Sequence, residues 1–95
     1  MTTQVRVRVQ FFAALREALG EEQLELLVPS AVALSALKAA VVQAAGTVLD
    51  DDTHFATLLN GPNVRLAVNR AFAHGAELEL AEGDELAFLP PVTGG

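Results

Sequence analysis

Apolar and polar residues alternate near both ends of the chain. Between Gln4 and Phe11, valines at every second position are separated by arginine and glutamine, which predicts a strand with one buried face. Between Leu86 and Leu89 the same alternation predicts a last strand, which the prolines after Leu89 would end. These are the cleanest strand patterns in the sequence, and we expect the two strands to lie side by side in the centre of a sheet.

Segments with helical periodicity lie between these two strands in the sequence. From Leu34 to Ala45 the larger apolar residues recur three and four positions apart, which predicts the principal helix. A shorter helix is expected from Ala13 to Leu19, stopped by Gly20, and another from Thr53 to Leu59. Further strands are expected at Leu24 to Val28, Val64 to Val68 and Ala76 to Leu80.

The order of these elements predicts the fold class. Two strands, a long helix and several further strands follow one another without repeats or linkers, and 95 residues suit a single domain. The main helix has one apolar stripe, so one mixed sheet is enough to cover it. We therefore predict an α+β roll of β-grasp layout that spans residues 1–95.

Composition excludes several kinds of function. The chain has no cysteine, which excludes disulfides, thiolate zinc sites and cysteine nucleophiles. Its net charge of −6 repels phosphate backbones, so nucleic acid is not an expected partner. The sequence has no long apolar stretch of the kind that predicts a signal peptide or a membrane span. We therefore expect a cytoplasmic protein. His54, His74 and the aspartates 50–52 lack metal-ligand spacing, so no metal or bound cofactor is expected.

The end of the sequence carries the one credible chemical handle. Its last six residues are Pro90, Pro91, Val92, Thr93, Gly94 and Gly95. The diproline predicts a flexible tail, residues 90–95, that leaves the last strand, and glycine can enter a narrow tunnel without a Cβ clash. A carboxylate acylates poorly until its oxygen becomes a leaving group. Use of the Gly95 carboxylate therefore implies a partner that activates it with ATP.

Strand alternation also predicts an exposed apolar patch beside this tail. If Phe11 points into the core, Phe12 points away from it, and Ala87 and Leu89 point outward from the last strand. Phe72, which follows a predicted turn, would extend the patch. Clustered exposed apolar groups usually mark an interface. The alternative is that some of these side chains belong to a satellite of the core.

An acidic stretch precedes the last strand. It consists of Glu77, Glu79, Glu82, Asp84 and Glu85. Together with the terminal carboxylate, this stretch predicts that partner surfaces are basic and that charge steers association. The alternative is that these acids only keep the protein soluble.

The sequence resembles the small subunits of molybdopterin synthase, which are ubiquitin-like sulfur carriers. The resemblance covers nearly the whole chain, and its most specific segments are Phe11 to Glu17, Ala67 to Asn69, Gly83 to Glu85 and Phe88 to Gly95. It implies a β-grasp fold without a catalytic centre of its own. An activating enzyme would adenylate Gly95 with ATP, sulfur would convert it to a thiocarboxylate, and the large synthase subunit would use that sulfur to build the molybdopterin dithiolene from cyclic pyranopterin monophosphate.

The resemblance also implies roles for single residues. Gly95 would hold the sulfur and residues 90–94 would form the tail inserted into the large subunit, within a heterotetramer. The positions that would meet partner proteins are Phe12, Arg16, Phe72 and Leu89, with Ala87 added by strand alternation. The chain departs from the family pattern at Leu89, often Phe, at Ala33, commonly Thr or Ser, and in a longer segment 50–63.

Two other functions stay open. A related carrier, such as the one that supplies sulfur for thiazole synthesis, shares the fold and the Gly-Gly end. The diproline and the Phe11-Phe12-Ala13 segment favour the molybdopterin carrier over it. A β-grasp module that only binds proteins would have a Gly-Gly end without chemical meaning.

Overall fold

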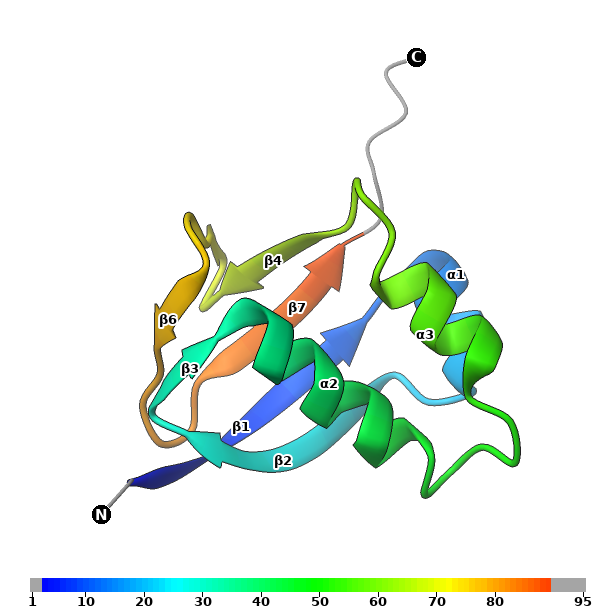
Figure 1. Cartoon of the computed structure of the whole chain (residues 1–95), viewed down its shortest axis with the longest axis horizontal. Helices are drawn as coiled ribbons and strands as arrows, with labels where there is room; N and C mark the ends of the chain where they lie inside the picture. Colours follow the sequence, from blue (N-terminus) through cyan, green and yellow to red (C-terminus); the bar gives the residue numbers. More distant parts are fainter. Residues whose placement is uncertain (1–2, 90–95) are drawn as a thin grey trace.

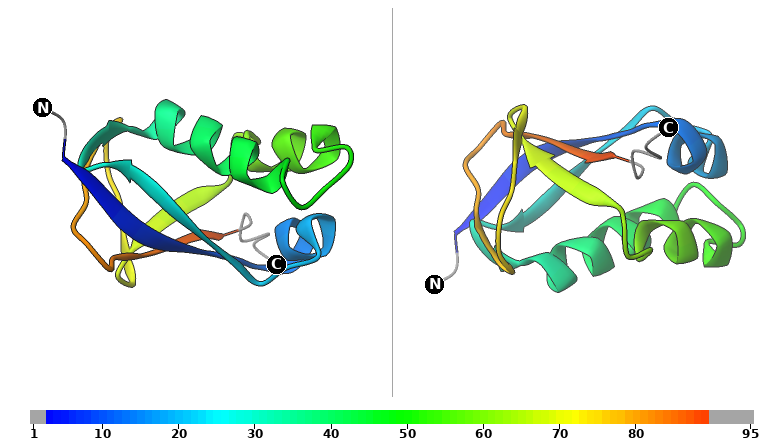
Figure 2. Two further views of the ribbon diagram at one scale, coloured as in Figure 1. Left: turned by 90° about the horizontal axis from the view of Figure 1, so that it is seen from below. Right: turned by 90° about the horizontal axis from the view of Figure 1, so that it is seen from above.

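A five-stranded mixed sheet carries the main helix across one of its faces (Figures 1 and 2). The computed structural model describes residues 3–89, so the predicted tail 90–95 lies outside the described residues. The elements in chain order are β1 (Gln4–Phe11), α1 (Ala13–Leu19), β2 (Gln23–Pro29), β3 (Ala31–Ala33), α2 (Leu34–Ala45), α3 (Thr53–Leu59), β4 (Arg65–Val68), β5 (Ala71–Phe72), β6 (Glu77–Glu79) and β7 (Glu85–Leu89).

The predicted central pair of strands is confirmed. The sheet order is β2-β1-β7-β4-β5, in which β1 runs parallel to β7 and every other neighbouring pair is antiparallel. Parallel strands need a long crossover, and the chain between β1 and β7 supplies it with α2 and α3 on the same face of the sheet (Figure 2). This arrangement is the predicted β-grasp fold.

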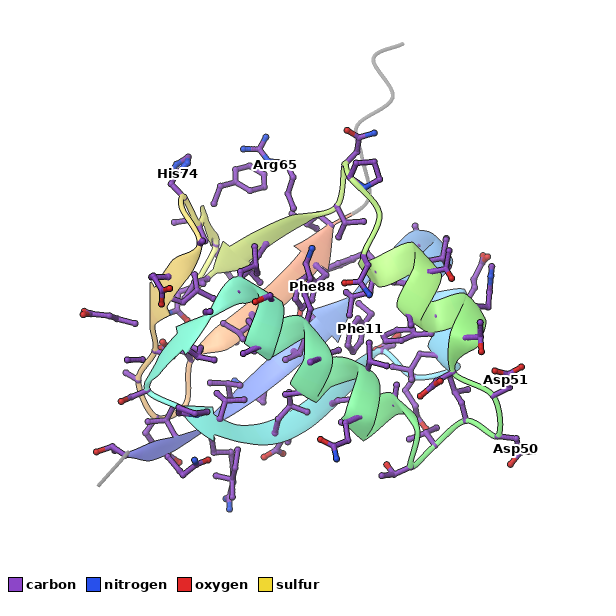
Figure 3. The ribbon with its side chains drawn as sticks, viewed as in Figure 1. Phe11, Asp50, Asp51, Arg65, His74 and Phe88 are labelled. Carbon is purple, nitrogen blue, oxygen red and sulfur yellow. The ribbon has the colours of Figure 1, made fainter. Side chains whose placement is uncertain are left out.

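The core lies between the sheet and these two helices. Val5, Val7 and Val9 alternate inward along β1 and are buried against Leu37 and Val41 of α2. Three phenylalanines complete the core toward α3. The ring of Phe11 meets Phe55 edge to face with centroids 5.4 Å apart, and it stacks with Phe88 at 6.5 Å. In the view of Figure 3, Phe11 and Phe88 are seen between α2 and α3.

A second, two-stranded sheet was not predicted as a pair. β3 pairs antiparallel with β6 and places Val32 opposite Leu78, both of them buried. The N-cap residue of α2, Ala33, has no capping side chain, but the strand pairing gives the first N–H of the helix another acceptor. The backbone N–H of Leu34, one of the N-terminal amides that have no acceptor within the helix, donates to the carbonyl of Ala76 at 2.7 Å.

Both short helices are present where the sequence predicts them. α1 ends at Gly20, whose left-handed φ of 79° lets its N–H bond to the Arg16 carbonyl. Before α3, the carboxylate of Asp51 accepts a hydrogen bond from the Thr53 N–H at 2.9 Å. The side-chain and backbone hydrogen bonds of Thr53 lower the pKa of Asp51.

Candidate functional site

The outer face of the sheet, opposite α2, contains a groove of about 310 Å³. It is lined by Gln10, Phe12, Ala67, Arg70, Phe72, Glu85, Leu86, Ala87 and Leu89. Four of the five residues predicted to meet partners, Phe12, Phe72, Ala87 and Leu89, are therefore brought together. The predicted apolar patch exists, and it is concave.

Small residues in the middle strands create the hollow. Strand pairing aligns Gln10 of β1 with Ala87 of β7, Ala87 with Ala67 of β4, and Ala67 with Phe72 of β5. The two alanines offer only methyl groups to the outer face, while Phe12 and Phe72 stand beyond them and keep 39% and 46% of their surface exposed. The result is an alanine floor between two aromatic rings, a shape that suits an inserted apolar side chain.

A tight turn positions the Phe72 side of the groove. Asn69 and Arg70 between β4 and β5 both have left-handed backbones, with φ of 49° and 73°. Asn69 tolerates this conformation better than most residues. The consecutive left-handed pair folds β5 back antiparallel onto β4 and places Phe72 directly opposite Ala67.

Side-chain hydrogen bonds connect that turn to the start of β7. The Asn69 amide donates from Nδ2 to Oδ1 of Asp84 at 3.0 Å, and Oδ1 of Asn69 accepts the Glu85 N–H at 3.0 Å. Asp84 also accepts the Ala81 N–H at 2.8 Å. These hydrogen bonds form a clamp between the turn at Asn69 and the segment at Asp84. The clamp holds β4 and β7, the strands that form the floor of the groove, in place relative to each other.

The acidic stretch does not form one continuous surface. Glu82 accepts the Arg6 N–H at 2.9 Å and Asp84 belongs to the clamp, while Glu77 and Glu79 lie on β6 in the second sheet. Only Glu85 lines the groove, where its Oε1 lies 3.6 Å from Arg8 and accepts a hydrogen bond from Gln10 at 3.3 Å. At the groove, the acidic stretch therefore gives no support for the predicted basic partner surface.

Arg16 lies beside the groove and not in it. It lines an adjoining hollow together with Gln10 and Phe12, and its Nη1 lies 4.0 Å from Oε1 of Glu22. Phe12 and Gln10 line both hollows, so Phe12 forms the ridge between them. A partner that covers Phe12 would reach Arg16 on its far side.

Sequence reasoning missed part of the groove. The lining residues that were not predicted as site residues are Gln10, Ala67, Arg70, Glu85 and Leu86. The alternation of β4 offered a signal for Ala67, because Leu66 is buried in the core and its neighbours must face outward. Arg70 had no such signal, because its direction depends on the left-handed turn.

Within residues 3–89 no three histidine, aspartate or glutamate side chains gather as a metal site would require. In the same range no helix is long and apolar enough to cross a membrane. Gly95 and the other predicted tail residues, Pro90 to Gly94, lie outside the described part of the chain. The last groove residue, Leu89, directly precedes them in the sequence.

Residues 9–95 match the ThiS family. A search of curated proteins gives no match. Among solved structures, SAMP1 (small archaeal modifier protein 1) from Haloferax volcanii is 24% identical with a TM-score of 0.71, covering 95% of this chain and 99% of that one.

Two further structures share the fold. A putative molybdopterin converting factor, subunit 1, from Pyrococcus furiosus is 24% identical with a TM-score of 0.70, and the match covers 93% of this chain and 99% of that one. In a complex of subunits 1 and 2 of the molybdopterin-converting factor from Helicobacter pylori, a chain is 23% identical with a TM-score of 0.60, over 96% of this chain and all of that one.

Proposed function

The chain belongs to the ThiS family of ubiquitin-like sulfur carriers, and we propose that it is the sulfur-carrying small subunit of a molybdopterin synthase. The observation that carries the proposal is the groove between Phe12 and Phe72, whose last residue, Leu89, directly precedes the Gly-Gly tail in the sequence. A docking surface next to a reactive terminus lets one partner hold the body while it acts on the tail. The complex of subunits 1 and 2 from Helicobacter pylori supports a partner of this kind.

The proposed chemistry takes place at the carboxylate of Gly95. An oxygen of that carboxylate attacks the α-phosphorus of ATP, pyrophosphate leaves, and an acyl adenylate forms on an activating enzyme. Hydrosulfide then attacks the acyl carbon and AMP leaves, which gives the thiocarboxylate without any change of oxidation state. The large subunit would take this sulfur for the dithiolene of molybdopterin, and hydrolysis of the acyl–sulfur bond by water would return the carrier as a carboxylate.

Within this scheme the chain supplies binding and positioning. Phe12, Phe72, Ala87 and Leu89 would bury an apolar side chain of the partner, and Arg16 would contact it beside Phe12. Pro90, Pro91, Val92, Thr93 and Gly94 would carry Gly95 into the active site of the large subunit. The catalytic residues would belong to the activating enzyme and to the large subunit, and ATP would bind there.

A second pathway has its own support. The family match is to ThiS, and the similar structures include an archaeal modifier protein, so a sulfur carrier for thiazole synthesis or another acceptor is the alternative. It shares the groove, the tail and the activation step. The two proposals differ only in the enzyme that consumes the sulfur.

Reconstitution with purified partners tests the proposal. The full chain, a Gly95 deletion and a chain with one residue added after Gly95 would each be incubated with the activating enzyme, ATP, a sulfide source, the large subunit and cyclic pyranopterin monophosphate. Only the full chain should support molybdopterin formation, while circular dichroism should show the same fold for all three. Molybdopterin formed by either altered chain would refute the role of Gly95. Sulfur loading without transfer to the large subunit would favour the alternative pathway.

A further inference from the structure

The arginines of this acidic protein are not spread evenly over its surface. The chain has five arginines and one lysine. Arg6 and Arg8 alternate outward on β1, because Val5, Val7 and Val9 fill the core side of that strand. Arg65 points outward from β4 beside the buried Leu66, as Figure 3 shows, and Arg70 lines the groove. Arg16 lines the adjoining hollow. Every arginine therefore lies on or beside the outer face, and Lys38 is on α2, across the sheet.

Five of the twelve acids lie away from the groove. Asp50, Asp51 and Asp52 precede α3 on the helical side, and Glu77 and Glu79 lie on β6 in the second sheet. On the outer face Glu85 is paired with Arg8, and Glu25 of β2 lies opposite Arg8 in the strand register. Glu22 is paired with Arg16. Among the residues that line the groove, Glu85 is the one acid and Arg70 is the one cation.

The guanidinium groups at the Phe72 side of the groove are available to a partner. Among residues 3–89, neither Arg65 nor Arg70 makes an ion pair. The Cζ atom of Arg65 lies over the Phe72 ring, 4.2 Å from its centroid, and this contact holds the guanidinium against the aromatic surface. Arg70 is exposed and lines the groove beside Phe72. A partner that fills the groove therefore meets two unneutralised cations at one end.

We propose that the groove binds an acidic protein segment, in which an apolar side chain sits on the alanine floor between Phe12 and Phe72 and neighbouring carboxylates pair with Arg65 and Arg70. The argument rests on charge complementarity, because a guanidinium and a carboxylate form strong paired hydrogen bonds when an interface excludes water. This inference deepens the proposed function, on which it rests, by naming the chemistry of the partner surface.

Ionic strength decides whether the charges at the groove or the net charge of the whole chain has the larger effect on binding of an acidic segment. The net charge of −6 repels an acidic partner at long range. At physiological salt the Debye length is about 8 Å, so distant acids are screened while contacts inside the groove are not. Binding of an acidic segment should therefore survive at physiological salt, and at low salt the remaining acids should slow its approach.

A titration with two short peptides tests the inference without any pathway partner. Both contain Leu-Phe, flanked by Asp and Glu in one peptide and by Lys and Arg in the other. The backbone amide signals of the full ¹⁵N-labelled chain are followed at physiological salt. The acidic peptide should shift the signals of Phe12, Arg70, Phe72 and Ala87. The basic peptide should bind at least about tenfold more weakly than the acidic one. Equal binding, preference for the basic peptide, or shifts confined to other residues would overturn the proposal.

Two charge reversals on opposite faces provide a matched control. Arg70→Glu and Lys38→Glu change the net charge equally, but only Arg70 lines the groove. We expect Arg70→Glu to lower the affinity for the acidic peptide about tenfold. Lys38→Glu should change that affinity less than about twofold. Equal losses of affinity in the two variants would mean that only the net charge matters, and they would overturn the proposal. Groove signals that move on dilution of the chain alone would instead assign the groove to a second copy.

These outcomes are independent of the test of the proposed function. If sulfur transfer fails in reconstitution while the peptides behave as expected, the groove keeps its acidic partner and the pathway assignment falls. If sulfur transfer succeeds while the peptide preference is absent, the carrier function stands and the inference about partner charge falls.

Discussion

Two neighbouring cross-strand rows of the same sheet have opposite character. The inner row aligns Phe11, Phe88 and Leu66, all of them buried under the helices. The outer row, one residue along each strand, aligns Gln10, Ala87, Ala67 and Phe72. Both rows follow from the same alternation, because successive side chains point to opposite faces. A strand pair that packs the core thus also builds the floor of the groove on the other face.

The difference between the rows lies in side-chain size. Large rings on the inner row interdigitate with Phe55 of α3 and leave little space. Small alanines on the outer row leave a hollow, and the exposed rings of Phe12 and Phe72 border it. The comparison separates residues that should govern unfolding from residues that should govern binding, and substitutions can test that separation.

The largest expected effect is loss of stability from the inner row. Phe88→Ala removes a fully buried ring that stacks on Phe11, and we expect it to lower the free energy of unfolding by about 3 to 5 kcal/mol. Leu89→Ala, the next position on β7, should cost less than about 1.5 kcal/mol because Leu89 is only half-buried on the outer face. Urea denaturation measures both. Equal losses would mean that the two faces are not energetically distinct.

The next effect concerns binding. Phe12→Ala should weaken binding to the large subunit by at least about tenfold, because an aromatic side chain at the centre of an interface typically contributes more than about 1 to 2 kcal/mol. Its melting temperature should change little, since Phe12 is exposed on the outer face. Calorimetric titration and thermal denaturation separate the two readouts. Loss of folding without a separate binding defect would assign Phe12 to the core.

The clamp between the β4–β5 turn and β7 should have a smaller effect. Asn69→Gly keeps the left-handed backbone accessible but removes both side-chain hydrogen bonds, which should cost about 1 to 2 kcal/mol of stability. Asn69→Ala should cost more, because alanine also resists the positive φ. The difference between their denaturation midpoints isolates the backbone contribution. Identical midpoints would show that the turn conformation has no measurable cost.

The smallest effect is expected where β1 meets α1. Ala13 has a φ of 52°, a left-handed conformation that disfavours residues with a Cβ. Ala13→Gly should relieve this cost and, after the loss of chain entropy that glycine brings, raise stability by roughly 0.5 kcal/mol. Ala14→Gly, in the same helix, is the matched control and should lower stability. A decrease for both variants would contradict the strain at Ala13.

Most of the fold was predictable from periodicity. The alternation in β1 and β7 predicted the inward direction of Phe11 and Phe88 and the outward direction of Phe12, Ala87 and Leu89. The three-and-four spacing predicted α2. The pairing of β3 with β6 was not predicted. Three-residue strands show too little alternation to be recognised, and Val32 and Leu78 are far apart in the sequence.

The site was predicted in its apolar part and missed in its charged part. Exposed aromatic residues stand out in a sequence, whereas the groove depends on which alanines the strand register aligns. The charge of the face also depended on three-dimensional placement. The acids before β7 turned out to accept backbone hydrogen bonds or to lie in another sheet, and the arginines scattered along the chain lie on or beside one face. Sequence proximity alone could not have given either result.

Intact-protein mass spectrometry tests the central claim most directly. The full chain is incubated with ATP, a sulfide source and its cognate activating enzyme, and the mass is compared with that of a Gly95 deletion treated in the same way. The carrier function predicts that the full chain gains one sulfur in place of one oxygen at its terminal carboxylate, only when ATP is present, and that the deletion gains nothing. An unchanged mass for the full chain, in a reaction where the enzyme demonstrably loads another carrier, would contradict the account.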